Sequence, residues 1–124
     1  MSLKFTPDHE WINIQDLTAA VVGITPHAQD ALGDVVFVDL PKVGSQFKMG
    51  EVAGVVESVK AAADIYMPVT GEVVAVNDAL SADPSLANSD PQGAGWFFKV
   101  KVAQPSELDG LLDATNYDQL IKTA

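Results

Sequence analysis

Short apolar segments, separated at close intervals by turn-forming residues, constrain the fold of this chain more than any other feature. The segments expected to be strands are 17–22, 35–40, 52–59, 71–76 and 97–102. In the last of them, apolar residues alternate with Lys99 and Lys101, a period of two that indicates one buried and one solvated face. Glycine, proline, asparagine and aspartate lie between the segments. This spacing predicts a mainly β fold of the sandwich or barrel type, not alternating β-α units.

Signals for helices are fewer and lie outside the expected strands. Thr25 and Pro26 form a helix start and Gly33 a helix stop, so a short helix is expected between them. The pair Asp83-Pro84 suits one short turn. The C-terminal segment is expected to be helical, with capping-like pairs at Ser106/Asp109 and Thr115/Asp118 and a buried face of Leu108, Leu111, Leu112, Leu120 and Ile121.

Composition excludes several classes of function. The 124 residues suffice for one domain with a real core, so residues 1–124 are interpreted as a single domain. Seven lysines and no arginine stand against 17 acidic residues, for a net charge of −10. Such a surface repels phosphate backbones and anionic membranes and suits basic protein partners, although solubility alone also explains it. With no cysteine, the chain has no disulfide, thiolate metal site or cysteine nucleophile.

The expected location is a bacterial-type cytoplasm. Residues 1–7 lack the basic end and apolar stretch of a secretory signal, and no apolar run approaches the roughly 18 residues that span a bilayer. His9 and His27 lack ligand-like spacing, so no metal site is predicted. His9, beside Trp11, is interpreted as a packing residue.

The segment 55–73 carries the most chemical information. One lysine, Lys60, is followed by three alanines and flanked by apolar arms, and a strand-turn-strand reading places it on a hairpin spanning about 57–64. A long, uncrowded amine on a hairpin suits a post-translational attachment site. Spacing alone favours an ordinary solvated turn lysine over an attachment site, and both interpretations stay open at this level.

The sequence around Lys60, Glu57-Ser58-Val59-Lys60-Ala61-Ala62, is similar to the attachment motif of glycine cleavage H proteins. The likeness continues in the family's order at segments 9–11, 23–25, 31–34, 38–41, 43–44, 68–73, 76–77, 88–91 and 95–96, and at Leu111, Leu112 and Tyr117. Because many signatures occur in register along nearly the whole chain, the resemblance is specific.

The resemblance implies a lipoyl-domain type of fold, a barrel-sandwich hybrid of two antiparallel sheets with a few short helices. It implies lipoate bound covalently to Lys60 and no catalytic residues, since the protein serves as a carrier. The lipoyl group would carry the aminomethyl group of glycine from glycine decarboxylase to aminomethyltransferase, and electrons to dihydrolipoyl dehydrogenase. A lipoyl or octanoyl transferase would modify Lys60 first. Nucleic acid and membranes are not expected partners.

Three acidic residues acquire roles from the resemblance. Glu10 and Asp64 correspond to positions implicated in holding the cationic loaded arm, for which a charge-assisted hydrogen bond is chemically suitable. Glu57 is expected to help the lipoylating enzyme recognise the hairpin. Ordinary surface acidity is the alternative for Glu10 and Asp64. Ala31 replaces a histidine that lines the arm's cleft in some family members, and Ala63 replaces a small hydroxyl residue.

Other functions compete with this interpretation. Biotinyl domains carry methionine on both sides of the modified lysine, and lipoyl domains of 2-oxo acid dehydrogenases usually show Asp-Lys-Ala. Val59 and Ala61 both differ from the biotinyl pattern, and Val59 differs from the aspartate of the 2-oxo acid dehydrogenase pattern. An enzyme using Glu10, Glu57 or Asp64, or an acidic adaptor without a cofactor, represents a different class. A relay that hands lipoate to other carriers is not separable from glycine cleavage by sequence.

Overall fold

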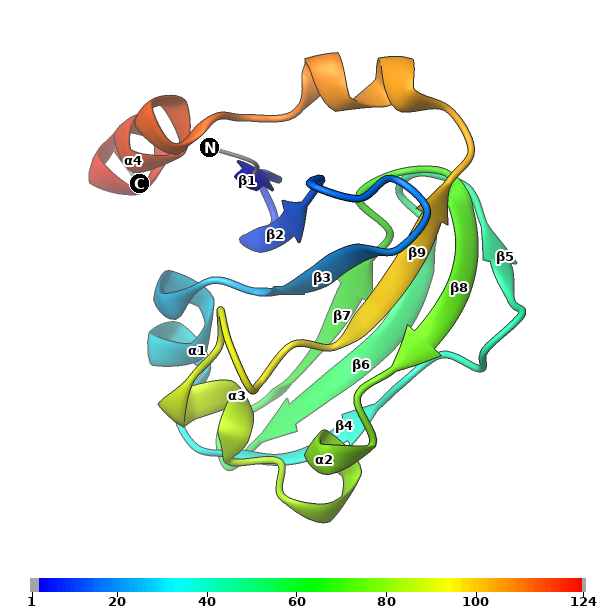
Figure 1. The fold of residues 1–124 in the computed structure, drawn as a ribbon. Coiled ribbons are helices and arrows are strands. Elements are labelled where there is room, and N and C mark those ends of the chain that lie inside the picture. Colours follow the sequence, from blue (N-terminus) through cyan, green and yellow to red (C-terminus); the bar gives the residue numbers. More distant parts are fainter. Residues whose placement is uncertain (1–2, 124) are drawn as a thin grey trace.

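Two antiparallel sheets enclose the core in the computed structural model, which describes residues 3–123 (Figure 1). The larger sheet contains, in spatial order, β1 (Leu3–Phe5), β2 (Glu10–Asn13), β3 (Ala20–Ile24), β9 (Phe98–Val102), β8 (Gly71–Val76) and β5 (Gln46–Phe47). The smaller sheet contains β4 (Val35–Asp39), β6 (Val52–Ser58) and β7 (Ala62–Tyr66), in that order. The predicted fold class, mainly β with two antiparallel sheets and a few short helices, is confirmed.

The expected strands coincide with β3, β4, β6, β8 and β9, and only the first is displaced. Strand β3 begins at Ala20 and not at Leu17, because Asp16 organises a turn before it. The Asp16 carboxylate accepts hydrogen bonds from the amide and the hydroxyl of Thr18, at 2.9 and 2.6 Å. The short strands β1, β2 and β5 were not predicted, because runs of two to four residues show no clear period.

Helix α1 (Pro26–Leu32) has the predicted bounds, with the Thr25 hydroxyl accepting from the amide of Ala28 at 3.2 Å. The expected turn after Asp83 is α3 (Leu86–Ser89), whereas α2 (Asp78–Ala82), capped by Asn77, was not predicted.

The predicted C-terminal helix is confirmed, but both predicted caps are wrong. The 3-10 helix η1 (Pro105–Gly110) has no side-chain cap bond at its start. Helix α4 (Ala114–Thr123) already includes Thr115, and Asp113 accepts from the Asn116 amide at 2.8 Å. Aspartate is as good an N-cap as threonine, so the sequence offers two helix starts, Asp113 and Thr115, only two residues apart, and the earlier one is used.

The main core lies between the two sheets. Val22, Val73 and Val100 of the larger sheet and Val56 of the smaller one are fully buried in it. Leu108 and Leu111 join this core, whereas Leu112, Leu120 and Ile121 pack on a smaller cluster of Phe5, Trp11 and Tyr117. Within residues 3–123, no helix is long and apolar enough to cross a membrane.

Candidate functional site

The turn between β6 and β7 carries Lys60 as the strand-turn-strand interpretation predicts. The Ser58 amide donates to the Ala61 carbonyl at 2.8 Å, which closes a turn whose central residues are Val59 and Lys60. The central residues of a two-residue hairpin turn usually have positive φ. Neither Val59 nor Lys60 does, because the non-glycine residue with positive φ among residues 3–123 is His9. The Ser58 hydroxyl stabilises this turn instead, because its oxygen accepts from the amides of Lys60 and Ala61 at 3.2 and 3.1 Å.

The exposed Lys60 side chain extends over Gly33, the C-cap residue that follows α1. A Cβ atom at Gly33 would lie 2.9 Å from Cε of Lys60, so any other residue there would make the end of the lysine side chain shift from its present position. Gly33 also has φ 78° and ψ −158°, a conformation essentially restricted to glycine. The attachment lysine therefore rests on a backbone surface supplied by another part of the chain.

Asn88 of α3 holds this supporting backbone in place. Its Oδ1 accepts from the Val35 amide at 2.8 Å, and its Nδ2 donates to the Gly33 carbonyl at 2.8 Å and to Gln29 Oε1 at 3.0 Å. Asp34 lies between Gly33 and Val35, and its carbonyl accepts from the Val59 amide at 3.0 Å. The tip is therefore fixed from both sides, by its own strands and by the α1–β4 connection.

Glu57 and Asp64 lie on the solvent-facing side of the smaller sheet. Glu57 is opposite Ala62, and Asp64 is opposite Val55, so the alternation of side chains along each strand places both carboxylates on one face. Both are exposed. The structure thus brings Lys60, Glu57 and Asp64 onto one hairpin.

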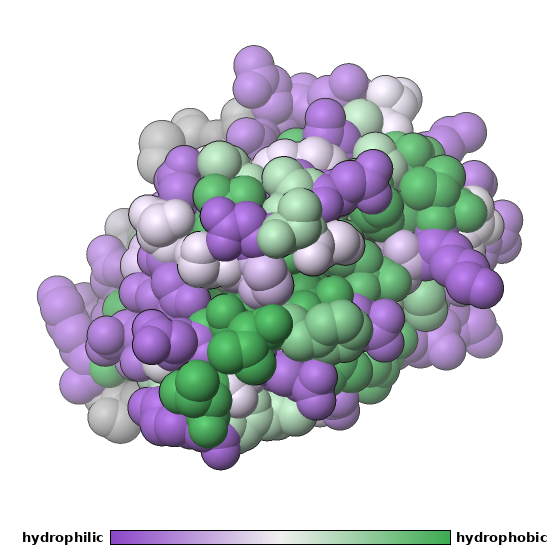
Figure 2. All heavy atoms as spheres, turned by 90° about the horizontal axis from the view of Figure 1, so that it is seen from below, coloured by the Kyte–Doolittle hydropathy of each residue, from purple (hydrophilic) through white to green (hydrophobic). Residues whose placement is uncertain are grey.

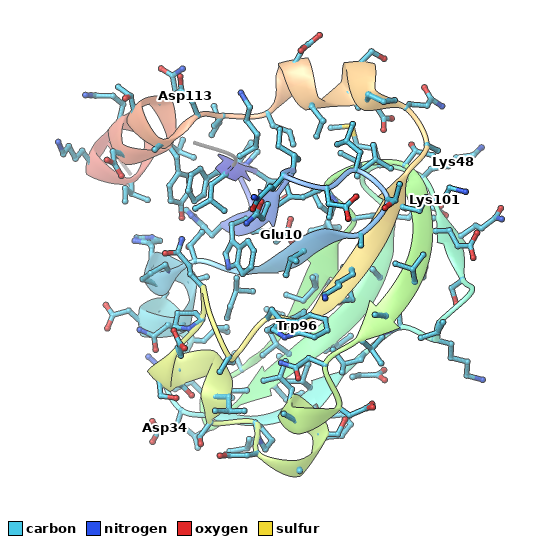
Figure 3. The ribbon with its side chains drawn as sticks, in the orientation of Figure 1. Glu10, Asp34, Lys48, Trp96, Lys101 and Asp113 are labelled. Atoms are coloured by element: carbon cyan, nitrogen blue, oxygen red, sulfur yellow. The ribbon has the colours of Figure 1, made fainter. Side chains whose placement is uncertain are left out.

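Glu10 is different, because its carboxylate is buried inside the molecule with 1% of the residue exposed (Figure 3). One carboxylate oxygen accepts from the Thr6 hydroxyl at 2.9 Å, and the other accepts from the Tyr66 amide of β7 at 2.8 Å. Burial raises the pKa of this carboxyl to about 7, although the two hydrogen bonds oppose the shift. The bond to Tyr66 connects β2 with an edge strand of the smaller sheet, so ordinary surface acidity does not describe Glu10.

His9 belongs to a second buried polar group, which fastens α4. Its Nδ1 lies 2.8 Å from the Tyr117 hydroxyl, which in turn lies 2.7 Å from the Thr25 hydroxyl. The ring of Tyr117 stacks on Phe5 with centroids 4.7 Å apart. Burial and the adjacent His27 lower the pKa of His9. The interpretation of His9 as a packing residue agrees with these contacts.

Lys60, Glu57 and Asp64 lie on the surface and Glu10 lies inside it, and none of the four lines the hollow beside β5 and β8. That hollow, of about 490 Å³, lies beside β5 and β8, with Lys48 and Lys101 among its lining residues (Figure 3). Among residues 3–123, no group of three or more histidine, aspartate or glutamate side chains is arranged to hold a metal ion.

Sequence reasoning missed the three residues that support Lys60. Ser58 was named only as part of the attachment motif, although serine next to a turn is a common source of side-chain to backbone hydrogen bonds. Gly33 was assigned only as a helix stop. Asn88 lay within a segment matched to the family but received no role, and no local signal links it to a lysine 28 positions earlier.

Comparison with known proteins decides the family. A model of the family described as "Glycine cleavage H-protein" matches residues 3–124. The chain belongs to the glycine cleavage H-protein family. A glycine cleavage system H protein of Neisseria meningitidis serogroup C is 58% identical over 115 residues, which cover 93% of this chain and 90% of the relative. A glycine cleavage system H protein of Escherichia coli O127:H6 is 55% identical, and the alignment covers 97% of this chain and 93% of the relative.

The fold agrees with that assignment to the family. The crystal structure of a glycine cleavage system H protein from Mycobacterium marinum superimposes with a TM-score of 0.89 at 40% identity. The match covers 98% of this chain and 97% of that protein. Because both lengths are covered almost completely, the H-protein likeness extends to the helices that surround the hairpin as well as to the sheets.

Proposed function

We propose that this H protein is the lipoyl carrier of a glycine cleavage system, with lipoate attached to Lys60. In this role it transfers the aminomethyl group of glycine from glycine decarboxylase to aminomethyltransferase and passes electrons to dihydrolipoyl dehydrogenase. The protein itself contributes no catalytic residue. The observation that carries the proposal is the position of Lys60, at the tip of a hairpin whose backbone is held by Ser58 and by Asp34.

The residues around Lys60 fit an amide-linked lipoyl group. The lysine is exposed, its neighbours Ala61 and Ala62 are small and exposed, and its stem is supported by Gly33. An acyl group on Nζ therefore extends away from the protein without displacing a packed side chain. When bound, lipoate supplies a dithiolane whose sulfur atoms accept a carbon group and electrons. The chain supplies position, and tethering raises the effective concentration of the arm at each partner.

Asp64 and Glu10 have different parts in this proposal. Asp64 lies on the exposed face of the hairpin and has a carboxylate available to a cationic group on the arm. Glu10 already accepts hydrogen bonds from Thr6 and Tyr66, so contact with the arm requires residues covering it to move. A cation that reaches Glu10 favours its ionised form and lowers its pKa from about 7.

The proposed partners are the three enzymes named above and a lipoyl or octanoyl transferase, and the proposed location is the cytoplasm of a bacterial-type cell. The net charge of −10 favours encounter with basic surfaces on these enzymes, with rates that fall as salt increases.

Intact mass tests the attachment directly. The protein is co-expressed with a competent lipoylating enzyme, and the wild type is compared with Lys60→Arg, which retains the charge but cannot form the amide. Lys42→Arg, at an exposed lysine in the β4–β5 connection, is the matched control. We expect one lipoyl increment on the wild type and the control and none on Lys60→Arg, followed by glycine–bicarbonate exchange with glycine decarboxylase only for the modified proteins.

Three results contradict the proposal. An unmodified wild type after co-expression favours an adaptor without cofactor. Substrate turnover by the protein without lipoate favours an enzyme. Lipoylation with no exchange activity assigns the carrier to a system other than glycine cleavage.

A further inference from the structure

Apolar side chains are exposed beside the hairpin tip, where a protein surface is ordinarily polar. Phe37 and Val36 of β4 are 51% and 55% exposed, and Val59 in the turn is 68% exposed. Phe37 is directly opposite Glu57 of β6, so β4 brings these apolar residues to the same face as the hairpin carboxylates. Figure 2, which views the molecule from below, shows exposed hydrophobic atoms bordered by hydrophilic ones at this end.

A β-bulge produces this exposure. The register between β4 and β6 shifts between Val35 and Phe37, so Val36 is an extra residue and two consecutive apolar side chains face solvent. Val35 and Val38 on either side are buried. Without the shift, strict alternation would place one of the two exposed residues inside.

The border of this region is acidic. Three exposed carboxylates form it. Asp34 lies just before β4, Asp39 lies at the end of β4, and Glu57 lies opposite Phe37. We call the six residues Val36, Phe37, Val59, Asp34, Asp39 and Glu57 the hairpin face. An apolar centre with an acidic border is complementary to an apolar surface bordered by lysine and arginine.

A second copy of this chain does not fit the hairpin face. Each copy carries a net charge of −10, so two acidic borders would meet. Strand β4 is an edge strand of the smaller sheet, but its bulge interrupts the hydrogen-bonding row that another strand would need. The recognition therefore relies on side chains and on a partner of opposite charge.

We propose that the hairpin face is the docking surface for the enzyme that acylates Lys60, an inference that rests on the proposed function. In that reaction the Lys60 amine attacks the carbonyl carbon of an activated lipoyl ester or anhydride. The amide C–N bond forms, the carbonyl's bond to the leaving group breaks, and the amine proton passes to solvent. The amine itself must reach the enzyme's active site, so the enzyme covers the protein surface around the hairpin tip. Enzymes that act on the distal end of the arm are separated from this surface by the arm.

Steady-state acylation of the unmodified protein tests the proposal. The purified lipoyl transferase and its activated lipoyl donor are used with the wild type, Phe37→Ser and Val36→Ser. Val43→Ser is the matched control, because Val43 is 60% exposed but lies in the β4–β5 connection, outside the hairpin face. Phe37→Leu keeps the apolar character, and thermal unfolding verifies that each variant is folded.

We expect the KM for the carrier to rise roughly tenfold in Phe37→Ser, the loss typical of a central interface residue, with kcat little changed. Phe37→Leu should recover most of this loss and Val43→Ser should equal the wild type. An unchanged KM in both serine variants overturns the docking surface but leaves the attachment at Lys60 intact. Normal acylation with impaired glycine–bicarbonate exchange overturns it in favour of glycine decarboxylase as the occupant. A wild type that is never acylated at Lys60 contradicts the proposed function itself.

Discussion

The hairpin tip at Lys60 and the buried polar groups at Glu10 and Tyr117 are held in place in different ways. At the tip, a solvated lysine is positioned by hydrogen bonds to main-chain atoms and by the space above Gly33, with little apolar burial. At Glu10 and Tyr117, buried polar atoms bond to one another and join segments distant in sequence. Changes at the tip should therefore alter function at small cost in stability, and changes at the buried groups should do the reverse.

Tyr117→Ala should give the largest effect on stability. It removes the stack on Phe5 and leaves His9 and Thr25 without their common partner, so we expect a loss of about 3–5 kcal/mol in the free energy of unfolding. Chemical denaturation measures it. Tyr117→Phe, which removes only the hydroxyl, should lose about 1–2 kcal/mol. At temperatures where Tyr117→Ala stays folded, a lower rate of Lys60 acylation would show that the two regions are coupled.

Glu10→Gln should change the pH dependence of stability. The folded pKa of about 7 lies above the ordinary value of 4.5, so the folded state binds the proton more tightly than the unfolded state. This contribution is fully present below pH 4.5 and is lost as pH rises through about 7, an effect on the order of 3 kcal/mol.

Denaturation of the wild type and Glu10→Gln at pH 4.5 and pH 8 measures this linkage. The glutamine has no carboxyl to titrate, so the stability of the variant relative to the wild type should increase between the two pH values. Parallel pH profiles would mean that the Glu10 carboxyl titrates normally in the folded protein.

Gly33→Ala should reduce both stability and acylation. The alanine is strained at φ 78° and its Cβ displaces the Lys60 stem, so we expect a loss of about 1–3 kcal/mol in stability. Acylation should slow more than in Gly50→Ala, whose φ of 89° imposes comparable strain without a side chain within 4 Å. Equal acylation rates in the two variants would remove Gly33 from the support of Lys60.

Ser58→Ala should give the smallest loss of stability, about 0.5–1 kcal/mol, because the hydroxyl's hydrogen bonds are exposed. Faster hydrogen exchange at the amides of Lys60 and Ala61 is the expected signature, and Ser58→Thr, which keeps the hydroxyl, should restore protection. Unaltered exchange in Ser58→Ala would assign the order of the tip to the Asp34 bond instead.

Periodic and local signals made much of the fold predictable. Strand β8 has the expected bounds, and α1 does as well, because Thr25, Pro26 and Gly33 mark both of its ends. The Thr115 cap was wrong because Asp113 and Thr115 are both competent helix starts, and sequence does not say which is used.

The site was predictable only where it is local. Lys60 could be assigned to a turn because its flanking arms are strand-like. The burial of Glu10 could not be foreseen, because a carboxylate inside a protein depends on donors from elsewhere, here Thr6 and the Tyr66 amide. The exposure of Phe37 could not be predicted either, since the register shift in β4 depends on its pairing with β6.

The contact between β1 and the segment before α4 has a practical consequence for handling the protein. Phe5 and Leu112 exchange two backbone hydrogen bonds of 2.8 Å, which place the N-terminal strand beside the C-terminal helix at the upper left of Figure 1, whereas β6 runs toward the lower edge. A bead, sensor chip or fluorescent fusion attached next to β1 or α4 is thereby oriented away from the hairpin. Immobilised in this way, the protein presents its reactive end to enzymes flowing past it, and either terminus serves equally well.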